Sequence, residues 1–200
     1  MAYLKESDVR RVARADARVL AKSMDSGAVL RESSELDPSN KQFDVFLCHA
    51  IRDAEIILGA KRILEQQKLQ VYVDWIVDPE MDRSAVTAKT ADTLRNRMQN
   101  SSSLLYLFSN NSKRSRWMPW ELGYFDALKG NVAVLPIVSD AGGLDFSQEE
   151  YLDLYPKIEL QDSGLWVNRT KQGPVSAEDK KNYRLFKEWI AGSEKLRHYS

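Results

Sequence analysis

Residues 43 to 54 read FDVFLCHAIRDA, and they begin the part of the sequence that decides the fold. The first six residues are apolar except for one aspartate, a composition typical of a short buried strand. A polar corner, HAIRD, follows this run. Apolar residues then recur at helical spacing, at Ile56, Ile57, Leu58, Ala60, Ile63 and Leu64. The stretch therefore predicts a strand that leads through a short corner into a helix.

The same alternation of strand and helix continues along the chain. Further apolar runs that predict strands stand at 70–75 (QVYVDW), 103–109 (SLLYLFS), 131–138 (NVAVLPIV) and 157–160 (KIEL). A largely polar helix is predicted at 87–101, and a second helix lies between the strands at 103–109 and 131–138. Alternating strands and helices predict a parallel sheet whose right-handed crossovers cover both faces. We expect an α/β fold, a three-layer sandwich with a central parallel five-stranded sheet.

The N-terminal part of the chain precedes this pattern. Residues 7–22 have apolar side chains at helical spacing and predict a helix, whereas residues 23–40 resemble a linker. We therefore divide the chain into an N-terminal helical extension with its linker, 1–40, and one domain, 41–200.

The C-terminal part carries weaker signals. A polar segment at 161–174 is expected to connect the last strand to the end of the chain. From Ala177 onward, Tyr183, Phe186 and Ile190 stand at helical spacing. This spacing predicts a closing helix that packs on the sheet.

Composition and charge exclude several classes of function. The 29 basic residues balance 29 acidic ones, so no overall field favours nucleic acid. No apolar run approaches the ~20 residues of a membrane span, and the N-terminus lacks the apolar core of a signal peptide, so we expect a cytoplasmic protein. One cysteine, Cys48, and two histidines, His49 and His198, form no metal-binding motif, so no metal site is expected.

One glutamate stands inside an aromatic run, WMPWELGYF, at residues 117–125. At about 100° per residue, Glu121 projects with Trp117 into the middle of the apolar arc of the predicted helix. The flanking positions are Trp120 and Tyr124 on one side and Leu122 and Phe125 on the other. Taking a carboxylate out of water is costly unless it gains a partner or a task. Glu121 is therefore expected to pair with an arginine, such as Arg114 or Arg116, or to have a chemical role.

The motifs of common nucleotide-binding sites are absent from the sequence. No GxGxxG follows the first strand, and neither GxxxxGK[ST] nor GxSxG occurs. Ligands of parallel sheets bind beyond the carboxyl ends of the strands. The residues at these ends are Cys48, His49 and Ala50 after the first strand, Asp74 at the second, and Trp117 at the start of the following helix. We expect these side chains to meet at one edge of the sheet.

These segments resemble the TIR (Toll/interleukin-1 receptor) domain family. FDVFLCHAIRDA is similar to the family's opening strand and corner, FDVFISHxxxD, and YVDW is similar to its second strand. The loop from Val77 to Val86 corresponds to the BB loop. Residues 109–130, which contain WMPWEL, resemble the family's S-x-x-Y/F-x-x-S-x-W-x-x-x-E-L helix, and the strand at 131–138 follows it. The resemblance spans residues 41–138, with the segments in the family's order, and implies a flavodoxin-like TIR fold.

The resemblance also implies an activity. In enzymatic TIR domains, the glutamate four residues after the tryptophan cleaves the nicotinamide glycosidic bond of NAD+, and Trp117 and Glu121 have that spacing. A carboxylate beside an aromatic wall stabilises a ribosyl oxocarbenium ion, and nicotinamide leaves as a neutral group without a general acid. NAD+ is then the substrate, and no cofactor is expected. The candidate substrate-binding residues are Trp117, Cys48, His49, Ala50, Arg52 and Asp74.

Each binding candidate also has a structural interpretation. Trp117 stacks on a ring of the substrate or belongs to the core. His49 and Arg52 contact ribose and phosphates or are solvated loop residues. Asp74 contacts a ribose or caps the loop that follows it. Cys48 stands where many relatives have serine, and we expect a small buried residue there instead of a nucleophile.

Bacterial members of the family include the Thoeris antiphage TIR sensors, which make an ADP-ribose-derived messenger. We therefore expect an NAD+ glycohydrolase or cyclase in antiphage defence, self-assembly through the BB loop, and a separate effector reached through the messenger. Two alternatives stay open. One is a non-catalytic TIR adaptor or virulence protein that acts through TIR–TIR contacts. The other is a nucleoside deoxyribosyltransferase relative, which would also use a glutamate beside an aromatic wall.

Overall fold

One sheet of eight strands organises the part of the chain that the computed structural model describes. The described residues are 2–16, 19, 25–35, 41–50, 54–74, 88–109, 112, 115, 117–141, 149–161, 164–168 and 183–192. Five strands form a parallel ladder in the order β3-β2-β4-β5-β6. Their bounds are β2 Phe43–Cys48, β3 Val71–Val73, β4 Ser101–Phe108, β5 Val132–Val138 and β6 Lys157–Gln161. The predicted central five-stranded parallel sheet is confirmed.

Two further strands extend this sheet past β6, beyond what the sequence pattern predicts. β7 (Gly164–Asn168) pairs antiparallel with β6, and β8 (Tyr183–Leu185) pairs antiparallel with β7. The segment at 161–174 is therefore not only a polar connection, and Tyr183 belongs to a strand instead of the closing helix. That helix, α7, is limited to Phe186–Ala191.

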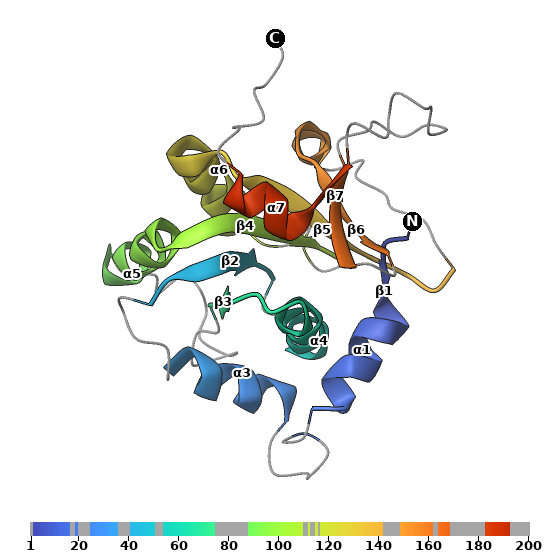
Figure 1. Cartoon of the computed structure of the whole chain (residues 1–200). Helices are drawn as coiled ribbons and strands as arrows, with labels where there is room; N and C mark the ends of the chain where they lie inside the picture. Colours follow the sequence, from blue (N-terminus) through green and yellow to red (C-terminus); the bar gives the residue numbers. More distant parts are fainter. Residues whose placement is uncertain are drawn as a thin grey trace.

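Helices α1 (Glu6–Arg14), α3 (Ser26–Glu35), α4 (Ala54–Gln66) and α7 contribute to a core on one face of the sheet. Figure 1 shows α1, α3 and α4 together below the sheet and α6 above it. The core on this face is largely aliphatic. Leu47 of β2 and Leu105 of β4 are fully buried in it together with Val9 of α1.

The N-terminal segment is integrated into this core. β1 (Leu4–Lys5) pairs in parallel with the end of β5, and Ala2 forms a bridge to Leu160 of β6. A Cβ atom on Gly59 of α4 would lie 2.0 Å from the backbone oxygen of Val9, so α1 and α4 pack with close backbone contact. Within the helix predicted at 7–22, α1 ends at Arg14, and residues 17, 18 and 20–24 lie outside the described residues. The expected linker at 23–40 contains α3. The domain boundary at residue 41 stays a prediction.

Helices α5 (Ala88–Gln99) and α6 (Trp117–Lys129) cover the opposite face, together with a short 3-10 helix, η3 (Glu150–Leu154). Helices on both faces give the expected three layers. Side chains alternate along each strand, so Phe46 and Cys48 of β2 point toward α6, whereas Leu47 points toward α4. Among the described residues, no helix has the length and apolar character needed to span a bilayer.

Candidate active site

Three serines build the corner that places α6 at the carboxyl end of β4. Ser112 Oγ donates to the carbonyl of Ser109 at 2.7 Å, and the amide of Ser109 donates back to Ser112 Oγ at 3.3 Å. The hydroxyl of Ser115 then accepts a hydrogen bond from the amide of Met118 at 3.3 Å, which caps the first turn of α6. Pro119 also lies in this first turn, where a missing N–H costs no helical hydrogen bond. The local sequence thus fixes where α6 starts.

Glu121 lies one turn into α6 and is 5% exposed. Met118, Leu122 and Phe125 of the same helix are buried in the core above the sheet. Trp120 and Tyr124 lie on the other flank, where they contact α5. This arrangement confirms the helical projection that places a carboxylate within the apolar arc. The alternative ion-pair partners, Arg114 and Arg116, lie outside the described residues.

The carboxyl end of β2 is tied to the start of α6. Cys48 is completely buried, and its thiol donates a weak hydrogen bond to the carbonyl of Met118, with sulfur and oxygen 3.7 Å apart. His49 Nδ1 lies 2.9 Å from the carbonyl of Leu47, and the residue is 4% exposed. Ala50 is also buried. The structure thus brings Cys48 together with the helix that carries Trp117 and Glu121, and the expected burial of Cys48 is confirmed.

Asp74 lies beside this corner. It follows Val73, whose parallel partner is Leu47, so Asp74 and Cys48 occupy neighbouring strand ends. The hydroxyl of Tyr72 donates to Asp74 Oδ1 at 3.3 Å. Burial and the Asp74 carboxylate both raise the pKa of Tyr72, which therefore stays a neutral donor. Asp74 is half-buried.

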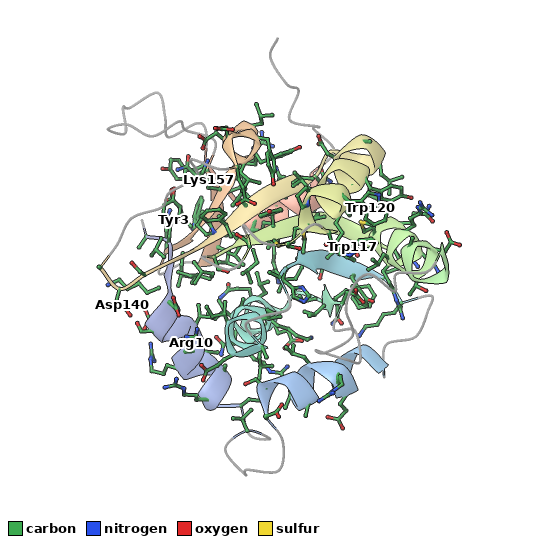
Figure 2. The ribbon with its side chains drawn as sticks, turned by 180° about the vertical axis from the view of Figure 1, so that it is seen from behind. Tyr3, Arg10, Trp117, Trp120, Asp140 and Lys157 are labelled. Carbon is green, nitrogen blue, oxygen red and sulfur yellow. The ribbon has the colours of Figure 1, made fainter. Side chains whose placement is uncertain are left out.

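Trp117 opens the aromatic flank of α6 (Figure 2). Its ring centroid lies 5.3 Å from that of Trp120, with the planes at 84°, an edge-to-face pair. Trp120 stacks on Tyr124 with centroids 5.8 Å apart and planes at 18°. Trp117 is half-buried, so it is neither a fully enclosed core residue nor a free surface side chain.

A buried polar cluster on the same face was not singled out by the sequence pattern. The hydroxyl of Tyr106 in β4 donates to Glu149 Oε1 at 2.9 Å, and Tyr151 of η3 lies near both. Burial raises the pKa of Tyr106 strongly. The tyrosine inside the apolar run at 103–109 could have indicated this cluster, because a buried hydroxyl needs a hydrogen-bond partner.

Two of the sequence-based candidates lie outside the described residues. These are Arg52 and the BB loop from Val77 to Val86. The remaining candidates, Cys48, His49, Ala50, Asp74 and the pair Trp117 and Glu121, all lie at the carboxyl edge of the parallel sheet on β2, β3 and α6. Their binding roles stay predictions.

Comparison with known proteins identifies the family. Residues 45–164 match the family described as TIR domain. The chain belongs to the TIR domain family. The match begins within β2 and includes β3, α6 and the described candidate residues, whereas α1, α7 and β8 fall outside it.

Two curated proteins are similar to this chain. The chain is 41% identical over 162 residues to the "Probable 3' cyclic ADP-D-ribose synthase ThsB'" of Bacillus cereus (strain MSX-D12), covering 81% of this chain and 82% of the relative. It is 26% identical over 106 residues to the "Putative cyclic ADP-D-ribose synthase TIR2" of Cytobacillus dafuensis, covering 52% of this chain and 28% of that protein. Among solved structures, the TIR domain of the Toll-related receptor TRR-2 from Hydra magnipapillata matches with a TM-score of 0.37 and 17% identity, covering 53% of this chain and 78% of the receptor domain.

Proposed function

We propose that this TIR domain protein cleaves NAD+ at the nicotinamide glycosidic bond and makes an ADP-ribose-derived product. The observation that carries the proposal is Glu121, a buried carboxylate four residues after Trp117, at the carboxyl edge of the sheet. The B. cereus relative named as a cyclic ADP-D-ribose synthase supports it, because the similarity covers 82% of that protein. The relative's name favours a cyclic product.

The chemistry follows from the placement of one carboxylate. The bond between the ribose C1′ and the nicotinamide nitrogen breaks, and its electron pair leaves with the nicotinamide, which becomes neutral. The ribosyl group is left as an oxocarbenium ion, whose positive charge the Glu121 carboxylate stabilises. A water molecule or a nucleophilic atom of the ADP-ribose itself then attacks C1′. Attack by water, which then loses a proton, gives linear ADP-ribose, whereas internal attack incorporates no water and gives a cyclic ADP-ribose.

The neighbouring residues take binding roles in this proposal. Trp117 provides a ring surface for a base, and Asp74 accepts a hydrogen bond from a ribose hydroxyl. Cys48, His49 and Ala50 form the corner that receives the reacting ribose, and Arg52 pairs with the phosphates. Glu121 then acts on a substrate that these contacts hold in place.

The biological setting is part of the proposal. A small nucleotide product would carry the signal to a separate effector, in line with an antiphage role. Self-assembly through the BB loop, Val77 to Val86, would complete the site and control activity. A cytoplasmic location fits an enzyme that consumes NAD+.

The test is release of nicotinamide from NAD+ by the purified protein, both dilute and concentrated with a crowding agent. We expect release by the wild type and a ~10²–10³-fold lower rate for Glu121→Gln. Asp126→Asn is the matched control, since it removes a carboxylate from the same helix on the side that bonds Tyr155. The mass of the second product separates cyclic from linear ADP-ribose, because the cyclic product is lighter by one water.

Two results would overturn the proposal. A folded Glu121→Gln variant that keeps full activity would return Glu121 to a structural role. A wild type that releases no nicotinamide in any assembled state would favour a TIR adaptor that acts through protein contacts.

A further inference from the structure

Three aromatic side chains of α6, Trp117, Trp120 and Tyr124, form a row of ring contacts, here called the aromatic row. Helix α5 contacts this row. The guanidinium carbon of Arg95 lies 5.6 Å from the ring centroid of Trp120. Arg95 is itself held by an ion pair with Asp92, at 2.8 Å. One turn further along α5, the side-chain amide of Gln99 donates to the hydroxyl of Tyr124 at 3.3 Å. Two side chains of α5 thus contact the second and third members of the row, Trp120 and Tyr124.

The three aromatic side chains pack against the border of the core on this face and remain partly exposed. The side chain of Arg95 is 44% exposed, and Trp117, Trp120 and Tyr124 are all half-buried. A hydrophobic core does not require an arginine over an indole at its border. What the contacts do achieve is to restrict the ring of Trp120, which has Tyr124 stacked on it and a cation over its face.

We propose that Trp120 is a positioning residue that holds the indole of Trp117 in a preset orientation for stacking on a base of the substrate. The edge-to-face contact between the two indoles transmits this constraint, and Arg95 supports it from α5. The inference rests on the proposed function, since the base would belong to NAD+. Trp120 acts through Trp117 and has no role in breaking the glycosidic bond.

The expected effect is on binding. A side chain that is already ordered loses less conformational freedom when a ligand stacks on it, so preorganisation strengthens binding of the substrate. The bond cleavage depends on Glu121, whose place on the helix does not depend on the Trp120 ring. A change at Trp120 should therefore raise KM and leave kcat nearly constant.

The first experiment compares Trp120→Leu with Trp120→Phe in steady-state nicotinamide release. We expect a ~3–10-fold rise in KM for Trp120→Leu, the range that one aromatic pair contributes, with kcat within about twofold. Trp120→Phe keeps a ring and should return KM most of the way to the wild-type value. Arg95→Met should raise KM in the same direction, and Arg95→Lys, which keeps the cation, should raise it less.

A double-mutant cycle tests whether Trp120 acts through Trp117. In a Trp117→Leu background, Trp120→Leu should add little further change in KM, because the indole that it positions is gone. Additive effects of the two changes would overturn the inference, as would an unchanged KM in a folded Trp120→Leu variant. An equal fall in kcat and kcat/KM would also overturn it, because that pattern belongs to a group that acts in the transition state.

A binding measurement separates this inference from the proposed function. In the Glu121→Gln background, calorimetry with NAD+ should show that Trp120→Leu raises Kd by the same factor as KM. Nicotinamide release by the wild type together with an unchanged Kd would sink the positioning role alone, whereas no release and no NAD+ binding by the wild type would sink both. Circular dichroism checks the fold. If Trp120→Leu does not fold, Arg95→Met carries the same test from an exposed position.

Discussion

Carboxylates on the two faces of the sheet have different surroundings. On the face covered by α1 and α4, Glu55 lies at the rim and accepts hydrogen bonds from two arginines, Arg10 at 2.7 Å and Arg14 at 2.6 Å. On the face covered by α5 and α6, Glu121 and Glu149 are 5% and 6% exposed and lie among aromatic side chains. The first face also has charged side chains with little exposure, but they form ion pairs, as Asp16 does with Arg62 of α4 at 2.7 Å. On the second face, Glu149 accepts hydrogen bonds from tyrosine hydroxyls instead.

This difference separates stability from function. Aliphatic packing and ion pairs on the first face stabilise the fold. On the second face, burying the side chains of Glu121 and Glu149 lowers the free energy of unfolding relative to apolar side chains of similar size. Local departures from optimal packing of this kind are expected where a protein carries out chemistry. The buried carboxylates of the α5 and α6 face support our proposal that the site lies there, with the α1 and α4 face as its scaffold.

The packing role of the first face is tested most strongly at Gly59. A Cβ atom at this position would meet the backbone oxygen of Val9 at 2.0 Å, and backbone cannot move aside as a flexible side chain can. We expect Gly59→Ala to lower the free energy of unfolding by about 2–3 kcal/mol, the upper part of the range for overpacked cores. Urea unfolding followed by circular dichroism measures the change.

Gly123 provides the matched control, since it is a helical glycine on α6 with nothing within 4 Å of an added Cβ. Gly123→Ala should raise the free energy of unfolding by about 0.5–1 kcal/mol through helix propensity. If the two alanine variants behave alike, α1 does not pack closely on α4 in solution, and the first face loses its supporting role.

The polar interior of the second face is tested at Tyr106. Tyr106→Phe removes the hydroxyl that bonds Glu149 at 2.9 Å and leaves a buried carboxylate oxygen without that donor. We expect a loss of about 1.5–2 kcal/mol in the free energy of unfolding. Tyr155→Phe, which breaks a 3.0 Å bond to Asp126 in a half-buried position, should cost less. If both variants lose the same free energy of unfolding, burial does not increase the contribution of the Tyr106–Glu149 hydrogen bond to stability.

Much of this arrangement could be predicted from the sequence. The strands at 103–109 and 131–138 are long apolar runs, and such runs predict strands well when both faces of the strand are buried. The position of Glu121 within the apolar arc followed from helical spacing alone, because α6 is an uninterrupted helix from Trp117 to Lys129. These signals are local in the sequence.

Other elements depend on contacts that the local sequence does not contain. β7 (Gly164–Asn168) is a five-residue strand stabilised by pairing with β6 and β8. α3 has a serine-rich sequence with weak helix propensity, yet Val29 and Leu30 are fully buried in the core on the α4 face. Arg95 could not be assigned to Trp120, because nothing in the sequence states which face of α5 meets α6.

The smallest expected effect concerns the border of the first face, at Glu55. The hydrogen bond from Arg14 lowers the pKa of Glu55 below its ordinary 4.5, Arg10 adds to this, and burial opposes it. A lowered pKa in the folded state contributes stability that is fully present above pH 4.5 and is lost as the pH falls through the lowered value. At pH ~7 we expect Glu55→Gln to lower the free energy of unfolding by about 0.5–1 kcal/mol, the value for exposed pairs.

Thermal unfolding across acid pH should show the difference from wild type shrinking below the ordinary pKa. Arg11→Met, which breaks a pair within α1 alone, should have almost no effect. If the difference in unfolding free energy between wild type and Glu55→Gln persists in strong acid, Glu55 stabilises the contact between α1 and α4 by packing. The ion pairs of Glu55 would then contribute nothing to stability.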